Sequence, residues 1–530
     1  FPEGALREWP NPLDVELMIR PQHPWVLNIL PLESVDVERG VARTTVPGTY
    51  PLLEVKAWAK EPGEPCAWIQ NVPEALTEPG EWVLNSAEGR LYLWPRGGEP
   101  GPGICAAATR EIIRLDGGGE DPVPVRNLVF RGLTFTGGGR DTWTEADAGL
   151  QHDWEMLDKE NALVRLRGAE NCRIDHCRFV HSAGSGVRLD LHCQDNSVSA
   201  CRFSHLGGTA ILLSGFGPGR LDVNHHNEVV DNSIEYCGEI YWHNAGIFVW
   251  QSGHNRIAGN HIRHLPYNGI VISGVRPHFF PQNERRECGK TIRYGETGAP
   301  GPRSYEEVMP FLHARHNLCE ENEIHDVMEL LWDGNGIYIS GTGPRNIIRS
   351  NYVHDIFGCQ SGIRTDDYQF DTLLEGNLVT RCLNAGFILK GVNRIENNVV
   401  ADLATRDRNG EECPIRGYIA LRQISPEHPT SEGSRICGNI LHHPGSQPVF
   451  FEEDNSPVDP SDLQVDFNVY WCAGDPEAAE RYLEARREDG TDSHSIATDP
   501  RFVDPESDDY RLRADSPARK LGICRAGVRV

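Results

Sequence analysis

The chain has 530 residues, 39% of them hydrophobic, and it contains 54 glycines and 36 prolines. This composition is typical of a soluble, turn-rich protein, and no apolar run approaches the roughly 20 residues of a membrane-spanning helix. The formal net charge of -26 repels nucleic acid and anionic membranes at long range, so we expect neither as a partner.

The 15 cysteines are an odd number and include no C-x-x-C pair. This pattern favours neither a zinc site nor a disulfide framework, so we expect most of them to be free and buried. Under the main interpretation developed below, we expect no metal and no cofactor.

Residues 1–125 contain no repeat, and they include the segment EWVLNSAEGRLYLWP. Two runs rich in apolar residues flank Gly89 in this segment, which is typical of a β-hairpin. We therefore predict an N-terminal antiparallel β module.

Residues 126–471 contain a short repeat of glycine, an aliphatic residue, any residue and a second aliphatic residue. A turn, the pattern NxI, an Asn with an aliphatic residue and a second turn complete the unit. Examples are GIFVWQSGHNRIAGNHIRHL from Gly246, GIYISGTGPRNIIRSNYVHDI from Gly336 and GIRTDDYQFDTLLEGNLVTRC from Gly362. Units start 23 residues apart from 246 to 269, 26 from 336 to 362 and 24 from 362 to 386. Such steps are typical of one coil of a parallel β-helix, so we predict an all-β, right-handed solenoid that forms the catalytic domain.

One polar position recurs at the same place in the units. An inward Asn at a tight turn can bond its own backbone and the equivalent Asn of the next coil, and a small Cys fits the same space. The predicted ladder comprises Cys177, Cys201, Asn232, Asn260, Asn322, Asn351, Asn377, Asn398, Asn439 and Asn468.

Residues 472–530 begin with the helical pattern DPEAAERYLEARRED. The open end of a solenoid exposes unpaired strand edges, which natural solenoids cover. We therefore predict that this segment is a C-terminal cap.

Candidate binding residues follow from the alternation of side chains along the first strand of each unit. Its second and fourth residues point inward, so the third and fifth form an outward column on coils about 4.8 Å apart. Aromatic faces and charges of both signs in one column are typical of a carbohydrate site. The column comprises Arg188 and Asp190, Phe248 and Trp250, Val271 and Ser273, Tyr338 and Ser340, Arg364 and Asp366, and Ile388 and Lys390.

The turns that lead into this strand add a second row of candidates. His243 and Asp333 each lie three residues before the glycine of their unit, and each follows a tryptophan. Tryptophans at such turns are costly to leave in water unless something covers them, which is either a packed loop or a bound substrate. The predicted substrate-binding residues are His243, Trp250, Trp332, Tyr338, Arg364 and Lys390.

A long insertion, residues 275–315, precedes the unit that carries Asp333. Long loops in compact folds are usually functional or disordered. This one is rich in basic residues although the chain is acidic, so we predict that it forms a wall of the substrate cleft and contacts a carboxylate. Its basic residues include Arg276, His278, Arg285, Arg286, Lys290 and Arg293.

The segments DGNGIYISG, NIIRSNYVHD and GIRTDDYQF, with WIQNVPEALTEPGEWVLNSAEGRLYLWP and DPRFVDPESDDYRLRADSPA, resemble the parallel β-helix glycosidases of glycoside hydrolase family 141. The family 120 β-xylosidases have a similar architecture. The resemblance implies an α-L-fucosidase or a xylan-type hydrolase that degrades plant or algal type polysaccharides or oligosaccharides. It also implies that Asp366 or Asp367 acts with Asp333. This chain opens at Phe1 without a basic and apolar leader, so the expectation of export, to the periplasm or outside the cell, rests on the resemblance.

Hydrolysis of a glycoside needs a carboxylic acid and a second carboxylate, about 5 to 5.5 Å apart for retention and about 6.5 to 9.5 Å for inversion. Adjacent Asp366 and Asp367 would alternate across a strand, so we expect the pair to be Asp333 and Asp366, with Asp367 tuning or replacing one of them. In a flat sheet Asp333 would lie roughly 15 Å from Asp366, so its turn must curl over the sheet.

Two other classes of function fit the same residues. In a polysaccharide lyase, Lys390 would remove a proton from a uronate, Arg364 would neutralise its carboxylate, and Asp366 with Asp367 would bind a calcium ion. A non-catalytic glycan-binding protein would bind sugar without any of these carboxylates. Every interpretation makes a carbohydrate the partner, and none indicates an oligomeric state.

Overall fold

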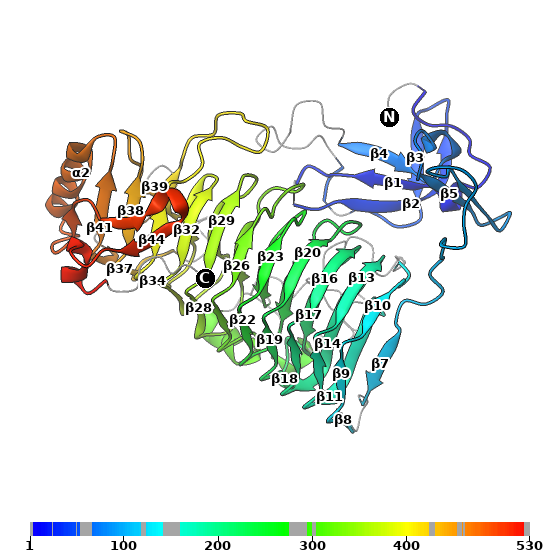
Figure 1. Cartoon of the computed structure of the whole chain (residues 1–530), viewed down its shortest axis with the longest axis horizontal. Coiled ribbons are helices and arrows are strands. Elements are labelled where there is room, and N and C mark those ends of the chain that lie inside the picture. The colour runs from blue at the N-terminus through cyan, green and yellow to red at the C-terminus, as the bar shows by residue number, and fades with distance from the viewer. Residues whose placement is uncertain are drawn as a thin grey trace.

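The structure is a computed structural model that describes residues 4–23, 25–48, 50–52, 66–117, 123–140, 160–274, 294–298, 304–422, 430–452, 458 and 462–523. Most of the strands form three long parallel sheets, and each coil of the chain contributes one strand to each sheet in turn. The result is an elongated parallel β-helix (Figure 1). No helix in the described ranges is long and apolar enough to cross a membrane.

The first sheet carries the predicted outward column. Its strands are β7 (Ile113–Asp116), β8 (Val125–Arg126), β11 (Ala162–Glu170), β14 (Ser185–Gln194), β17 (Ile211–Ser214), β18 (Asn224–His225), β21 (Ile247–Trp250), β24 (Ile270–Ser273), β27 (Asn335–Ser340), β30 (Ser361–Asp366), β33 (Ala385–Leu389), β36 (Gly417–Leu421) and β39 (Phe451–Glu452). Because β7 already pairs with β11 in parallel, the solenoid includes a strand that precedes residue 126.

The second sheet consists of short strands that follow those of the first. They are β9 (Val129–Arg131), β12 (Arg173–Asp175), β15 (Ser197–Ser199), β19 (Glu228–Val230), β22 (Arg256–Ala258), β25 (Leu318–Glu320), β28 (Asn346–Arg349), β31 (Thr372–Glu375), β34 (Arg394–Glu396), β37 (Arg435–Cys437) and β40 (Gln464–Asp466).

The third sheet completes each coil. Its strands are β10 (Thr134–Thr136), β13 (Arg178–Ser182), β16 (Arg202–Leu206), β20 (Ser233–Cys237), β23 (His261–Arg263), β26 (Glu323–His325), β29 (Tyr352–Ile356), β32 (Leu378–Cys382), β35 (Val399–Ala401), β38 (Ile440–His443), β41 (Val469–Cys472) and β42 (Ile496–Ala497).

The interior of the solenoid is a column of aliphatic side chains. Ile247, Ile337 and Ile363 occupy the same register on neighbouring coils of the first sheet, and all three are fully buried. Most of the described cysteines are free and buried in or beside this core, as predicted from their spacing. The alternation of strand residues thus separates an apolar inside from the outward column.

The predicted ladder of asparagines and cysteines is confirmed. From Asn260 to Asn468 each Asn accepts, through Oδ1, hydrogen bonds from the backbone N–H and the side-chain amide of the preceding ladder residue, at 2.9–3.2 Å. The residue before each ladder position has a positive φ, between 50° and 71°. Glycine occupies this position at 259, 376 and 438 because it adopts such a backbone without strain.

A second ladder, which we did not predict, joins the first and second sheets. It connects Cys172, Asn196, Asn227, Asn255, Asn317 and Asn346 through backbone N–H to side-chain oxygen bonds of 2.9–3.1 Å. Both ladders satisfy polar groups inside a solenoid whose tight turns leave them away from water. They also fix the register of one coil on the next.

The predicted N-terminal antiparallel module is present. β1 (Glu16–Ile19) lies between β2 (Asn28–Asp36) and β4 (Ala67–Gln70), β3 (Val41–Thr44) pairs with β2, and β5 (Trp82–Asn85) forms a hairpin with β6 (Arg90–Leu93). Met18 and Ile29 of this module pack against Tyr241 of the solenoid, and Trp68 contacts Trp242 with ring centroids 5.4 Å apart. The module therefore rests on the turns before β21 (Figure 1).

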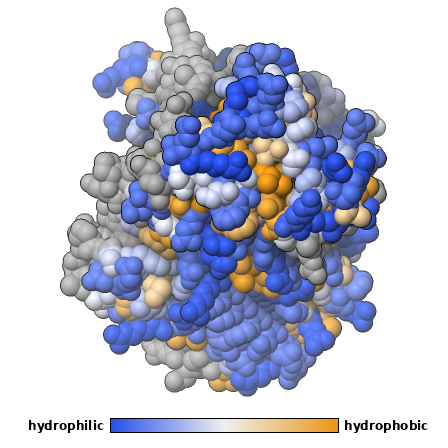
Figure 2. All heavy atoms as spheres, turned by 90° about the vertical axis from the view of Figure 1, so that its left-hand side faces the viewer, coloured by the Kyte–Doolittle hydropathy of each residue, from blue (hydrophilic) through white to orange (hydrophobic). Residues whose placement is uncertain are grey.

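The far end of the solenoid carries helix α2 (Pro476–Glu488) and a small pair of strands, β43 (Phe502–Asp504) and β44 (Asp509–Leu512). Ala479 and Leu483 of α2 join the core, and the Asn ladder ends where Ser495 Oγ accepts from the Asn468 backbone. Seen from this end, the surface is mainly hydrophilic, with smaller hydrophobic patches (Figure 2). In the structure, part of the 472–530 segment therefore covers the last coil.

Candidate functional site

The candidate site lies on the outward face of the first sheet, where β27, β30 and β33 are neighbours. Tyr338 pairs in register with Arg364, and Ser340 pairs with Asp366. Because side chains alternate along a strand, Tyr338, Arg364 and Asp366 point away from the core that Ile337 and Ile363 occupy.

Arg364 joins two of the predicted carboxylates. Its Nη1 donates to Asp333 Oδ1 at 2.8 Å, and its Nη2 donates to Asp366 Oδ1 at 2.8 Å. Asp333 lies in the turn before β27 with a φ of 63°, a left-handed conformation that is unusual for aspartate. The turn thus brings Asp333 over the sheet toward Asp366, as the predicted pairing requires.

Asp366 has two further partners. The Tyr338 hydroxyl donates to its Oδ2 at 2.6 Å, and Lys390 Nζ forms an ion pair with its Oδ1. Lys390 also donates to Asp367 Oδ1 at 3.3 Å. We refer to Asp333, Tyr338, Arg364, Asp366, Asp367 and Lys390 as the Arg364 cluster.

Asp367 occupies the turn that follows β30. Asp367 and Tyr368 both have positive φ values, 26° and 22°, so the chain leaves the sheet directly after Asp366. Both adjacent aspartates contact Lys390, and Asp366 also contacts Arg364 and Tyr338.

The side chains of the Arg364 cluster differ in their exposure to solvent. The side chain of Asp333 is 25% exposed, whereas those of Arg364, Asp366, Asp367 and Lys390 are nearly buried. Burial alone would lower the pKa of Arg364, but Asp366 and Asp333 raise it well above its usual value. Three carboxylates thus surround two cations, and solvent reaches the cluster most readily at Asp333.

The aromatic part of the outward column is covered. Trp250 and Tyr338 are almost fully buried, and they form a cluster with Phe248 on the sheet and with Val308 and Leu312 above it. The covering segment contains α1 (Tyr305–Val308) and the turn η9 (Met309–Phe311). Trp250 therefore points outward as predicted, but it lies beneath this segment and does not line an open groove.

The covering segment belongs to the predicted 275–315 insertion. Residues 275–293 and 299–303, which include the six basic residues named above, lie outside the described residues. The described part, residues 304–315, packs on the first sheet through Val308 and Leu312. The insertion thus covers the column next to the Arg364 cluster.

His243 and Trp332 are also buried. His243 Nδ1 is hydrogen-bonded to the backbone oxygen of Trp25 in the N-terminal module, and burial lowers the pKa of His243 to about 4. Its ring stacks on Tyr267 at 4.5 Å, and the Tyr267 hydroxyl donates to the Asp333 backbone oxygen at 3.3 Å. Trp332 lies under the guanidinium of Arg408 at 5.2 Å. These contacts give both residues a packing role beside the turn of Asp333.

Sequence reasoning missed two groups of charged or ring-nitrogen side chains. It placed Arg188 and Asp190 on the outward column but did not predict that they form a second buried ion cluster with Arg165. The segment SGVRLD that contains Arg188 and Asp190 matches SGIRTD at 361–366. The other group is His261, Glu323 and His325 on the third sheet. The repetition of HIR, EIH and YVH at equivalent strand positions was the signal for it.

Comparisons with known proteins concern the fold. A family model described as right handed beta helix region matches residues 126–262, which confirms the predicted fold class, including its hand. No curated protein matches the chain.

Three solved structures illustrate what the chain is similar to. A structure named glycoside hydrolase is 16% identical, with a TM-score of 0.48, and the match covers 91% of this chain and 70% of that one. An alginate lyase from Paenibacillus sp. str. FPU-7 is 11% identical, with a TM-score of 0.36 and coverages of 65% and 94%. A tailspike protein mutant of E. coli bacteriophage HK620 in complex with a pentasaccharide is 10% identical, with a TM-score of 0.34 and coverages of 59% and 51%. These likenesses are too distant to indicate an activity.

Proposed function

We propose that the chain is a glycoside hydrolase that uses Asp333 and Asp366 as its two carboxyl groups. The observation that carries this proposal is the shared guanidinium of Arg364, which binds both carboxylates at 2.8 Å. Their nearest oxygens therefore lie no more than about 8 Å apart, the sum of two hydrogen bonds and the width of the guanidinium. This bound includes the separation of about 5 to 5.5 Å in retaining glycosidases and the lower part of the range of about 6.5 to 9.5 Å in inverting ones.

The contacts of the two carboxylates support different roles. Asp366 receives Arg364, Lys390 and Tyr338, and donors of this kind stabilise the charged form of a carboxylate. We assign it as the nucleophile or general base. Asp333 receives one Nη of Arg364 and is the more exposed of the two, so we assign it as the acid that protonates the leaving oxygen.

The contacts of Lys390 favour a hydrolase over a lyase. A lyase would need a lysine with a free electron pair to remove a proton from the substrate. Here Lys390 Nζ forms ion pairs with Asp366 and Asp367, so its nitrogen is already engaged with two carboxylates. The same contacts direct the two carboxylates to Lys390 and away from a calcium ion.

For the substrate, the family resemblance leads us to propose plant or algal type oligosaccharides, with α-L-fucosides and xylan fragments as the first candidates. The negative charge of the cluster suits a neutral sugar better than a uronate, because a uronate carboxylate would meet three aspartates. Such a substrate would place the enzyme outside the cytoplasm.

The test is release of reducing sugar from a panel of fucosylated pectic oligosaccharides, xylan and alginate. We expect turnover on a neutral glycan and a loss of about 10²- to 10⁴-fold in Asp333→Asn and in Asp366→Asn. Asp515→Asn is the matched control, because it alters a surface aspartate that also binds an arginine, Arg501 at 2.7 Å.

Two outcomes would overturn the proposal. Ultraviolet absorbance from an unsaturated uronate, together with loss of activity in a chelator, would identify a lyase. Glycan binding that persists in both Asn variants, without turnover by the parent chain, would identify a binding protein.

A further inference from the structure

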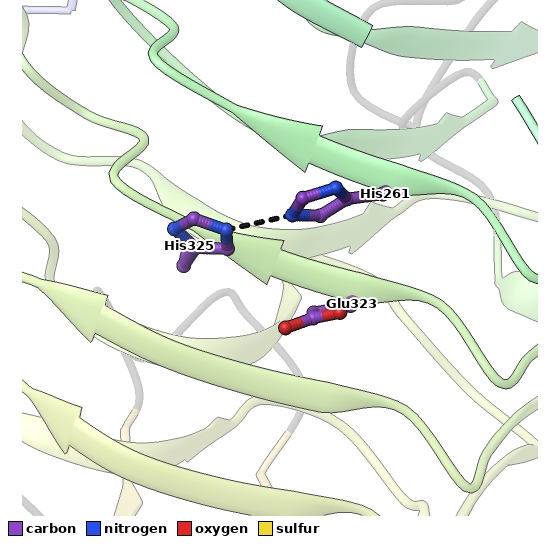
Figure 3. A group of neighbouring side chains, drawn as sticks. All are labelled: His261, Glu323 and His325. Atoms are coloured by element: carbon purple, nitrogen blue, oxygen red, sulfur yellow. Dashed lines mark hydrogen bonds between the residues drawn. The ribbon is translucent and has the colours of Figure 1, made fainter. Parts of the chain in front are cut away.

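The outer face of the third sheet carries a group of histidines and a carboxylate. His261 lies on β23, Glu323 and His325 on β26, and His354 on β29 (Figure 3 shows the first three). His261 pairs in register with Glu323, and His325 pairs with His354. Residues that are in register on adjacent parallel strands are separated by one strand spacing, so the parallel pairing places the four side chains together.

The potential ligand atoms converge. His261 Nε2 and His325 Nε2 are 2.8 Å apart, and one potential ligand atom from each of His261, Glu323 and His325 lies within 4.8 Å of the other two. In Figure 3 the rings of His261 and His325 face each other across the two strands, with Glu323 beside them. The described residues hold no second group of three such atoms at this spacing.

The hydrogen bonding of His325 suits a ligand. Its Nδ1 lies 2.7 Å from Asp326 Oδ2, and a carboxylate oxygen at this distance accepts a hydrogen bond from the N–H of that nitrogen. The electron pair of the ring then resides on Nε2, which faces His261. A carboxylate behind a histidine is the usual arrangement around metal-bound imidazoles.

His354 provides a second observation that points to a ligand. Its Nδ1 lies 2.7 Å from Asp355 Oδ2, so this ring is oriented in the same way as His325. Its Nε2 is buried and forms an ion pair with Glu323 Oε1 at 3.5 Å. This imidazole therefore lies against the carboxylate that faces His261 and His325.

We propose that His261, Glu323 and His325 bind one divalent transition-metal ion of the zinc type. Imidazole nitrogens with a carboxylate are ligands that such an ion prefers. Ligands about 2.0–2.1 Å from a tetrahedral zinc ion lie roughly 3.3 Å from each other, so the two Nε2 atoms need to separate by about 0.5 Å. Rotation of the two rings on the sheet surface provides this change, and His354 lies beside Glu323 at the open side.

The ion would join two coils on either side of the inserted segment. His261 and His325 are 64 residues apart in the chain, and the 275–315 insertion lies between them. A metal ion that joins the two ends of a long loop lowers the conformational entropy of the unfolded chain. An ion that binds only the folded chain also stabilises the folded state. The nearby Arg263 does not oppose the ion strongly, because Glu235 binds its guanidinium at 2.7 Å.

The test uses the full chain without a histidine tag, stripped with a chelator and titrated with Zn²⁺ or Co²⁺ alone. We expect one equivalent to bind, the Tm to rise, and bound Co²⁺ to show the visible absorption of a four-coordinate site. His261→Ala and His325→Ala should abolish these signals. Asp326→Asn should weaken binding about 10- to 100-fold, because it leaves the ligands but removes the orientation of His325.

A matched control is available in another histidine stack. His254 stacks with His226 and His316 at ring distances of 4.9 and 4.7 Å, and it belongs to no group of converging ligand atoms in the described chain. His254→Gln should bind the ion as the parent does. The Tm of each variant in chelator shows whether it folds.

Absence of saturable binding, or equal binding by the parent, His261→Ala and Asp326→Asn, would overturn the proposal. This result is independent of the proposed hydrolase, because the Arg364 cluster lies on another sheet. Asp333→Asn should bind the ion unchanged.

Discussion

The same six-residue pattern occurs twice on the first sheet, as SGVRLD at 185–190 and as SGIRTD at 361–366, with different surroundings. At the first copy, Asp190 lies between two guanidinium groups, Arg165 Nε at 2.6 Å and Arg188 Nε at 2.9 Å, and all three side chains are at most 1% exposed. At the second copy, Arg364 lies between two carboxylates, one of which is 25% exposed.

The preceding coil makes this difference. Arg165 is the register partner of Arg188, whereas Tyr338 is the register partner of Arg364. At the first copy, Arg165 provides a second guanidinium, and both guanidinium groups bind Asp190. At the second copy, Tyr338 takes the place of that arginine, so the guanidinium of Arg364 also binds Asp333 from the turn before β27. The same motif thus forms a closed buried ion cluster at one place in the solenoid and part of the proposed site at another. The residue at the register position on the preceding coil makes the difference.

The largest expected effect is on catalysis and concerns Asp190 and Asp366, the last residues of the two copies. Asp366→Asn should lower kcat about 10²- to 10⁴-fold on the glycan that the parent cleaves, because it removes the proposed nucleophile or base. Asp190→Asn should leave the kcat of the folded protein unchanged. Comparable losses in both variants would show that the two copies do not differ in function.

The second effect is on stability, and here we expect the larger change at Asp190 and the smaller one at Asp366. Asp190→Asn leaves two buried guanidinium groups without their shared carboxylate, which should cost about 3–5 kcal/mol of unfolding free energy. Asp366→Asn should cost less, since Asp333 still binds Arg364 and Asp367 still binds Lys390. Urea unfolding followed by circular dichroism measures both. An equal or larger cost at position 366 would contradict the comparison.

Replacing each central arginine by lysine sharpens the comparison further. A lysine cannot bind two carboxylates with the fork of a guanidinium, so Arg364→Lys should misplace Asp333 and lower kcat about 10- to 100-fold. Arg188→Lys should affect the urea midpoint only. Steady-state kinetics of both variants, with folding checked at the assay temperature, distinguish these results.

The smallest effect concerns Tyr338. Tyr338→Phe removes the hydroxyl that donates to Asp366 at 2.6 Å, a hydrogen bond to a charged group. The loss of roughly 1.5 kcal/mol should lower kcat about tenfold and leave the packing of the ring under the covering segment intact. An unchanged kcat would mean that Asp366 does not depend on this hydroxyl.

The β-helical coil could be predicted because the residues that determine it are close together in the sequence and recur in every unit. Asn322, Asn351 and Asn377 recur at the same place in successive units, and the structure bonds them in a single ladder. The second ladder was missed, although its residues stand in the NxI pattern of the same repeat. Asn255 and Asn346 begin that pattern in two units, and the pattern by itself does not indicate that their side chains point inward.

The surroundings of the site were less predictable, because they come from segments far away in the chain. Trp250 was correctly placed on the outward column, but the alternation of a strand does not reveal that Leu312 covers it. His243 shares its spacing with Asp333, yet only His243 meets the N-terminal module, at Trp25. The proposed metal ligands were missed because His261 and His325 are 64 residues apart in the chain and meet through the pairing of β23 with β26.

The Asn ladder crosses the 275–315 insertion without interruption. Asn260 and Asn322, which stand on either side of it, are joined at 3.0 and 2.9 Å, as are ladder residues in coils without an insertion. Closure of the coil is therefore independent of the length and content of the segment between them. A solenoid built in this way can acquire, lengthen or exchange its covering segment over evolutionary time, so that substrate preference changes while the scaffold is inherited intact.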